Sequence, residues 1–237
     1  KVGSGTLLKQ EYLEIPLSYG SLTVQLPRKE SSPAQGSPGT VSVQRLSHHV
    51  PKSAQKQLQK AMKASAKGDL NEAIQHLQRA LEEDPYFVEA HNNLGAQYLK
   101  QSRIEQAVAT FRHAESLDPE SARIQSNLAL ALLTARQPEE AEPHARKALS
   151  IQPASSQARY VLGCTQFALR KELDDAARNL SLVAAEFPRA NLLLGALLAQ
   201  KGNHREAEAK LKNYLGSANP NDRELVNRML QSLMKRE

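Results

Sequence analysis

The apolar positions of the chain from Ser53 onward follow the period of a helix, and the helical pattern repeats along the sequence. Prolines near the predicted helix ends lie 34, 34 and 35 residues apart, at Pro85, Pro119, Pro153 and Pro188. Proline cannot donate an N–H to a continuing helix, so each of them favours a stop. A fixed period of this length is typical of repeat architectures. The pattern therefore predicts a series of similar helix pairs.

Each predicted pair combines a small residue in one helix with a larger apolar residue in the other. The first helices carry a leucine followed by a small residue, at Leu94-Gly95, Leu128-Ala129, Leu162-Gly163 and Leu194-Gly195. The second helices carry Ala73, Ala107, Ala141, Ala176 and Ala207, and four residues later Leu77, Phe111, Ala145, Leu180 and Leu211. Small residues allow two helices to approach closely, and each pair leaves an apolar face for the next pair to cover.

These residues resemble the tetratricopeptide repeat family. The resemblance rests on Leu94, Gly95 and Tyr98, then on Ala107, Phe111, Ala114 and Pro119, and on the same positions one period later. It implies an all-α, right-handed α-solenoid of about five helix-turn-helix repeats over residues 53–219. Residues 220–237, with Leu225, Met229 and Leu233 on one side, are expected to form a C-terminal capping helix, which gives eleven helices in all.

Residues 1–52 have a different pattern and predict a short β-rich segment. Apolar and polar residues alternate in "GSLTVQLP", and "GTLLKQEYLEIPL" and "TVSVQRL" read as further strands. Pro and Gly mark residues 29–39 as a linker, and Ser53 is expected to cap the first helix. Two or three strands are only marginally stable by themselves. The segment is therefore expected to be either the remnant of a larger β-sandwich domain or a segment that pairs with a second copy of the chain.

The composition argues against nucleic-acid binding, a membrane span and an internal disulfide. The net charge of +6 is modest for 237 residues, and no basic stripe interleaved with aromatic residues appears, so no nucleic-acid partner is expected. No apolar run is long enough for a membrane span. The single cysteine, Cys164, allows no internal disulfide and is expected to be a small buried apolar residue.

No catalytic or metal-binding motif is present. The sequence has no nucleophile-elbow, P-loop, zinc-protease or paired-cysteine motif, and its histidines lack ligand spacing. Neither an enzyme nor a cofactor or metal site is therefore expected.

The family resemblance implies that the first helix of each pair lines a concave groove that binds a peptide or protein segment. The residues expected to bind it are Asn92, Asn93, Lys100, Arg123, Asn127, Leu130, Tyr160 and Phe167. Asn93 and Asn127 occupy equivalent positions, and a carboxamide can pair with both the N–H and the C=O of an extended peptide. The alternative is that both asparagines only solvate the inner face.

Leu130, Leu133, Tyr160 and Phe167 are expected to form an apolar strip for partner side chains, unless they pack between helices as core. The Lys/Asn clamp by which some members of the family hold a chaperone C-terminus is absent, since Leu58 and Met62 occupy its positions. The predicted function is a non-catalytic protein-interaction scaffold. The alternative is a structural spacer or self-assembly module of a larger bacterial envelope or secreted protein, dimerising through residues 1–52. That alternative slightly favours a periplasmic or secreted location over a cytoplasmic one.

Overall fold

The computed structural model describes residues 10–17, 20–27, 48–218 and 220–234, which fall into two compact units divided between Pro38 and Gly39. In the first unit, β1 (Gln10–Leu17) pairs antiparallel with β2 (Gly20–Pro27), with Gln10 opposite Pro27 and Leu17 opposite Gly20. The remaining residues predicted as β-rich, including the strand expected at 40–46, lie outside the described residues. The β-rich character of the whole segment therefore stays a prediction.

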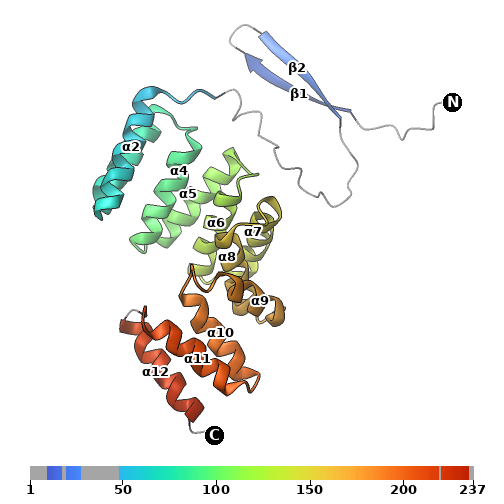
Figure 1. Ribbon diagram of the computed structural model, residues 1–237. Coiled ribbons are helices and arrows are strands. Elements are labelled where there is room, and N and C mark those ends of the chain that lie inside the picture. The colour runs from blue at the N-terminus through green and yellow to red at the C-terminus, as the bar shows by residue number, and fades with distance from the viewer. Residues whose placement is uncertain (1–9, 18–19, 28–47, 219, 235–237) are drawn as a thin grey trace, which may run out of the picture. The chain divides into compact units, whose positions relative to one another are not determined.

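The second unit is a stack of helices in chain order (Figure 1). Its described residues form eleven helices, as the repeat predicts: five pairs and a final helix. They are α2 (Lys52–Lys67), α3 (Leu70–Glu83), α4 (Val88–Lys100), α5 (Ile104–Leu117), α6 (Ala122–Thr134), α7 (Pro138–Ile151), α8 (Ser156–Leu169), α9 (Leu173–Val183), α10 (Arg189–Gln200), α11 (His204–Leu215) and α12 (Pro220–Met234). None of these helices is both long and apolar enough to cross a lipid bilayer.

The prediction that Ser53 caps the first helix is wrong, because Ser53 lies inside α2, which begins at Lys52. Pro51 precedes Lys52 with φ −56° and supplies no side-chain cap, while its carbonyl accepts from the N–H of Gln55 at 3.0 Å. Proline is suited to a helix start because its φ is already fixed near the helical value.

Glycine sets how closely the helices of one pair approach. A Cβ built on Gly95 would lie 2.8 Å from the Phe111 ring, and one on Gly195 would lie 2.7 Å from Leu211. Gly163 faces Leu180 at 2.8 Å in the same way. The third pair has alanine on both sides of the crossing, Ala129 in the first helix and Ala145 in the second, both fully buried. The predicted pairing of small with large residues is therefore confirmed, and the α6–α7 pair is the exception.

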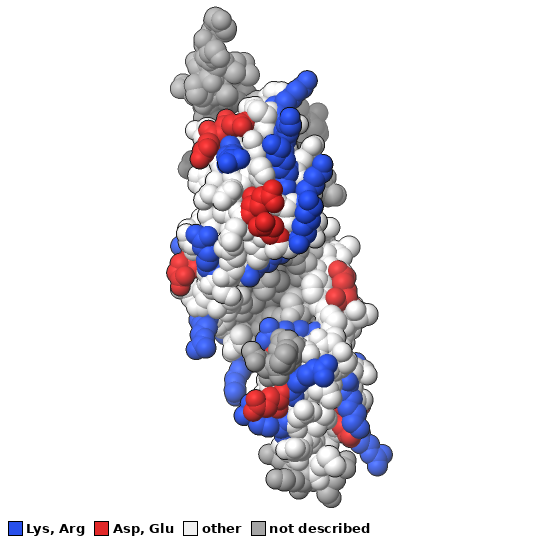
Figure 2. Space-filling model, turned by 90° about the vertical axis from the view of Figure 1, so that its left-hand side faces the viewer, with Lys and Arg blue, Asp and Glu red and all other residues white. Residues whose placement is uncertain are grey.

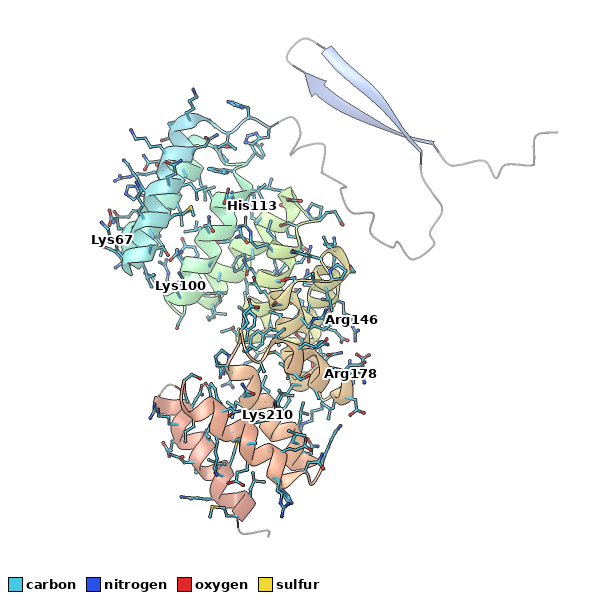
Figure 3. The ribbon with its side chains drawn as sticks, viewed as in Figure 1. Lys67, Lys100, His113, Arg146, Arg178 and Lys210 are labelled. Carbon is cyan, nitrogen blue, oxygen red and sulfur yellow. The ribbon has the colours of Figure 1, made fainter. Side chains whose placement is uncertain are left out.

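The first helices form the inner side of the stack. α4 contacts α6, α6 contacts α8, and α8 contacts α10, whereas no comparable contact joins α5 to α7, α7 to α9 or α9 to α11. Figure 3 places Arg146 of α7 and Arg178 of α9 together on the edge opposite Lys100 of α4. Successive repeats pack mainly through the second helix of one pair and the first helix of the next, and their first helices also touch directly. Side chains on the first helices can therefore reach from one repeat to the next.

The glycine contacts predict a measurable coupling between Gly95 and Phe111. Gly95→Ala should destabilise the fold by about 1–3 kcal/mol, because the added methyl overpacks the crossing. The same change should cost much less in a Phe111→Ala background, which reproduces the alanine pair of α6 and α7. Urea unfolding of the four proteins measures the coupling free energy.

Gly216→Ala is the matched control, since a Cβ there meets nothing within 4 Å. Equal costs for Gly95→Ala with and without Phe111 would contradict the account of the crossing.

Candidate functional site

A line of carboxamides crosses three repeats on the first-helix side. The side-chain amide of Asn127 in α6 donates to the carbonyl oxygen of Asn92 in α4 at 2.9 Å. The amide of Gln157 in α8 donates to the carbonyl oxygen of Asn127 at 2.6 Å. These three residues form what we call the carboxamide ladder. It hydrogen-bonds α4 to α6 and α6 to α8.

The ladder keeps hydrogen-bonding capacity for a ligand. A carboxamide has two N–H donors and an oxygen with two lone pairs. Asn127 uses one donor and one acceptor position within the ladder, and Gln157 uses one donor. Both side chains are half-buried, so they remain accessible, whereas Asn92 is only 3% exposed. Asn127 and Gln157 can therefore pair with a peptide backbone, while the buried Asn92 holds the Asn127 side chain in place by accepting its hydrogen bond.

Asn93 stands apart from this arrangement. It aligns with Asn127 in the repeat and is half-buried, but among the described residues its side chain makes no hydrogen bond. The ladder instead uses Asn92, one residue earlier in the chain. The three residues of the ladder, Asn92, Asn127 and Gln157, therefore do not occupy equivalent positions of the repeat.

Lys100, another predicted site residue, belongs to a polar contact between α2 and α4. Its Nζ donates to Ser65 Oγ at 3.2 Å, and the Ser65 hydroxyl donates to Gln97 Oε1 at 3.2 Å. Polar bridges between first helices thus run from α2 to α8.

Arg123, also predicted, lines a pocket of about 560 Å³ at the N-terminal ends of α4 and α6. Glu89 of α4 lies on the same wall, and the apolar lining comes from Val50, Phe87, Val88, Leu117 and Ile124. Glu89, Arg123 and Gln157 are spaced by 34 residues in the first turns of α4, α6 and α8. Arg123 also lies one helical turn before Asn127 in α6, so the pocket adjoins the ladder there.

Sequence reasoning did not identify the other residues of the pocket. Tyr86 is 64% exposed at its rim, and His48 lies edge-on to it with ring centroids 6.0 Å apart. His48 Nε2 is 2.7 Å from Asp84 Oδ2, and Asp84 Oδ1 accepts from the backbone N–H of Tyr86 at 3.1 Å. Tyr86 aligns with Glu120 and Ala154 in later repeats, so an aromatic residue stands only in the earliest of the three. That difference between repeats could have identified Tyr86 as a candidate binding residue from the sequence.

The predicted apolar strip is partly used in packing. Leu130, Leu133 and Tyr160 are half-buried against the core that runs from α2 to α8, and Phe167 packs with Tyr160 against α9 and α10 residues. The Tyr160 ring stacks on Phe187, with centroids 4.6 Å apart and planes 9° apart. Because all four side chains are half-buried, only part of each is accessible to a ligand.

Cys164 has no features of a nucleophile. Burial raises its pKa to about 11, although a hydrogen bond with Tyr160 opposes the rise. Burial also raises the pKa of Tyr160, and Cys164 acts in the same direction. Within the described residues, no group of three His, Cys, Asp or Glu side chains comes together in a way that could hold a metal ion.

The raised pKa predicts an unreactive thiol. At pH 8 the native chain should react with iodoacetamide at least ten times more slowly than the urea-unfolded chain, because almost no thiolate is present. Mass spectrometry of the alkylated protein measures the rate. Equal rates in the two states would show that burial does not protect the thiol.

Three family models described as Tetratricopeptide repeat match residues 64–131, 122–155 and 160–222. No curated protein matches the sequence. Among solved structures, the type IV pilus biogenesis factor PilW has a TM-score of 0.67 at 22% identity, over 78% of this chain and 87% of PilW. MamA has a TM-score of 0.56 at 24% identity, over 70% and 91%. YrrB, titled a TPR protein with an unusual peptide-binding site, has 0.55 at 22%, over 74% and 90%.

Proposed function

The chain belongs to the tetratricopeptide repeat family, and we propose that it is a scaffold that binds an extended segment of a partner protein along its first helices. Proteins with this repeat are typically non-catalytic and mediate contacts between proteins. One observation carries the choice of surface: the carboxamide ladder spans three repeats and keeps donors and acceptors unused. YrrB, which shares the fold, is described as binding a peptide.

In this proposal Asn127 and Gln157 pair with the backbone of the bound segment. Their mutual hydrogen bond fixes both side chains before the ligand arrives, so less conformational entropy is lost on binding. Backbone pairing is independent of the ligand's sequence, so specificity must come from side-chain contacts.

The pocket beside the ladder supplies those contacts. Its apolar wall accepts an aliphatic or aromatic side chain, and Tyr86 at the rim offers a rigid surface of the kind enriched at binding hot spots. Arg123 brings a positive charge to the lining, and Glu89 and Asp118 bring negative charges, which favours a partner with polar groups next to its apolar anchor. In this proposal the accessible parts of the half-buried Leu130, Tyr160 and Phe167 add further apolar contacts.

The proposal is tested with peptides selected from a random library against the full chain. Gln157→Ala should raise the Kd of the selected peptides about tenfold, the effect of losing one or two hydrogen bonds. Arg123→Gln should change which peptides are selected, because it alters the pocket and leaves the ladder intact. Isothermal titration gives the Kd, and thermal unfolding confirms that each variant is folded.

Asn213→Ala is the matched control, because Asn213 is an exposed carboxamide on the second helix of the last pair. The proposal fails if the Gln157 and Asn213 variants bind the selected peptides equally well.

A structural role with dimerisation through residues 1–52 is the second candidate. Among the described residues the sheet holds only β1 and β2, and a two-stranded sheet is marginal by itself. Pairing with a second copy would complete it. Light scattering should then give a dimer for the full chain and a monomer for residues 48–237, while a monomeric full chain would exclude this role.

A further inference from the structure

The exposed side of α2 carries a row of lysines, at Lys52, Lys56, Lys60, Lys63 and Lys67. Their spacings of four, four, three and four residues place all five within an arc of about 80° on the helix. The row is about 22 Å long at 1.5 Å per residue. All five residues are exposed, while Ala54, Leu58, Ala61 and Ala64 on the other side are buried. We call this row the lysine face.

The positive charge of this face is not neutralised within the described part of the chain. Helix α2 contains no acidic residue, and none of its lysines lies within 4.0 Å of a described carboxylate. By contrast, the lysines at 147, 171, 201 and 212 each pair with a glutamate or aspartate. Figure 2 shows the blue side chains aligned over the upper end of the helical unit, where α2 lies, and Figure 3 places Lys67 on the outer side of α2.

The repeat explains why this face is open. Lys56, Lys60 and Lys63 align with Ala90, Leu94 and Gln97 of the next repeat, which are all buried. Helix α4 packs against α3 of the preceding pair, and Gln97 accepts a hydrogen bond from Ser65 of α2. Lysines at the same positions of α2 cannot be buried against another apolar repeat, so the lysine face is the end surface of the stack.

An end surface must be polar for solubility, but solubility alone does not require a single sign of charge. The opposite end is closed by α12, which carries Asp222 and Glu224 together with Arg223 and Arg228. The exposed end at α2 must be polar for the same reason, but all of its charged residues are lysines. This difference points to an anionic partner.

We propose that the lysine face docks on the surface of an anionic lipid bilayer. A flat, continuous negative charge can engage all five lysines at once, and each lysine near such a surface adds to binding. Lysine is a hydrated point charge that needs no matched geometry, unlike the planar fork of arginine. The apolar side of α2 is buried, and the exposed Met62 lies outside the arc of the lysines, so the contact is peripheral.

Other anionic partners fit less well. Helix α2 has no arginine and no aromatic residue, the side chains that read bases or stack on them. An acidic protein would have to match five charges along one straight row, and each exposed ion pair would contribute little. A bilayer has no such requirement.

The test is sedimentation of the full chain with vesicles of phosphatidylcholine, with and without phosphatidylglycerol. The chain should bind only the anionic vesicles, and less as salt is added. Lys56→Gln/Lys60→Gln/Lys63→Gln should lower the partition coefficient roughly a hundredfold, since three lysines are lost from the contact. Glutamine keeps a similar helix propensity, so α2 should remain folded.

The matched control is Lys201→Gln/Arg205→Gln/Lys212→Gln, which removes the same charge from the α10–α11 region and should leave binding within about twofold of wild type. Equal losses for the two triple variants would overturn the proposal, because binding would then depend on net charge alone. Binding to neutral vesicles, or no binding to either kind, would also overturn it. Capture by poly-glutamate or duplex DNA without vesicle binding would assign the face to an acidic protein or a nucleic acid instead.

Discussion

The close crossing of the two helices in each pair is the constraint on which the rest of the structure depends. Gly95, Gly163 and Gly195 leave no room for a side-chain carbon beside Phe111, Leu180 and Leu211. This contact fixes the distance between the helices of a pair and so determines which face the pair offers to its neighbour. Because each pair offers the same face, the first helices come to lie next to one another, and the carboxamide ladder can bridge them.

The same repeat position serves different purposes along the stack. The first-turn row of α4, α6 and α8 holds Glu89, Arg123 and Gln157, which changes the surface from a charged pocket wall to part of the ladder. The row that packs between repeats is apolar at Leu94 but becomes Lys60 where no repeat precedes it. Function in such an array lies in these departures, because the positions that match the repeat are occupied in packing.

The repeat period predicted most of the helical unit, because the contacts that build it are local and periodic. Helix pairs, prolines after helix ends and the small-large crossings could all be predicted from the sequence. The ladder partner of Asn127 could not, since a shift from Asn93 to Asn92 depends on the rotation between successive first helices. The pocket was not predicted either, because His48 precedes α2, Tyr86 precedes α4 and Arg123 lies in α6, and only the stacking of successive pairs brings them together.

The side-chain amide signals of the full chain in a nitrogen-15 NMR spectrum show whether the ladder holds a partner's backbone. A peptide selected against the protein is titrated in, and the signals of Asn127 and Gln157 are followed with Asn213 as the reference. The signals of Asn127 and Gln157 should shift together along the binding curve while that of Asn213 stays in place. Unmoved ladder signals, with shifts confined to the backbone of residues 86–89, would rule out a role of the ladder and assign recognition to the pocket alone.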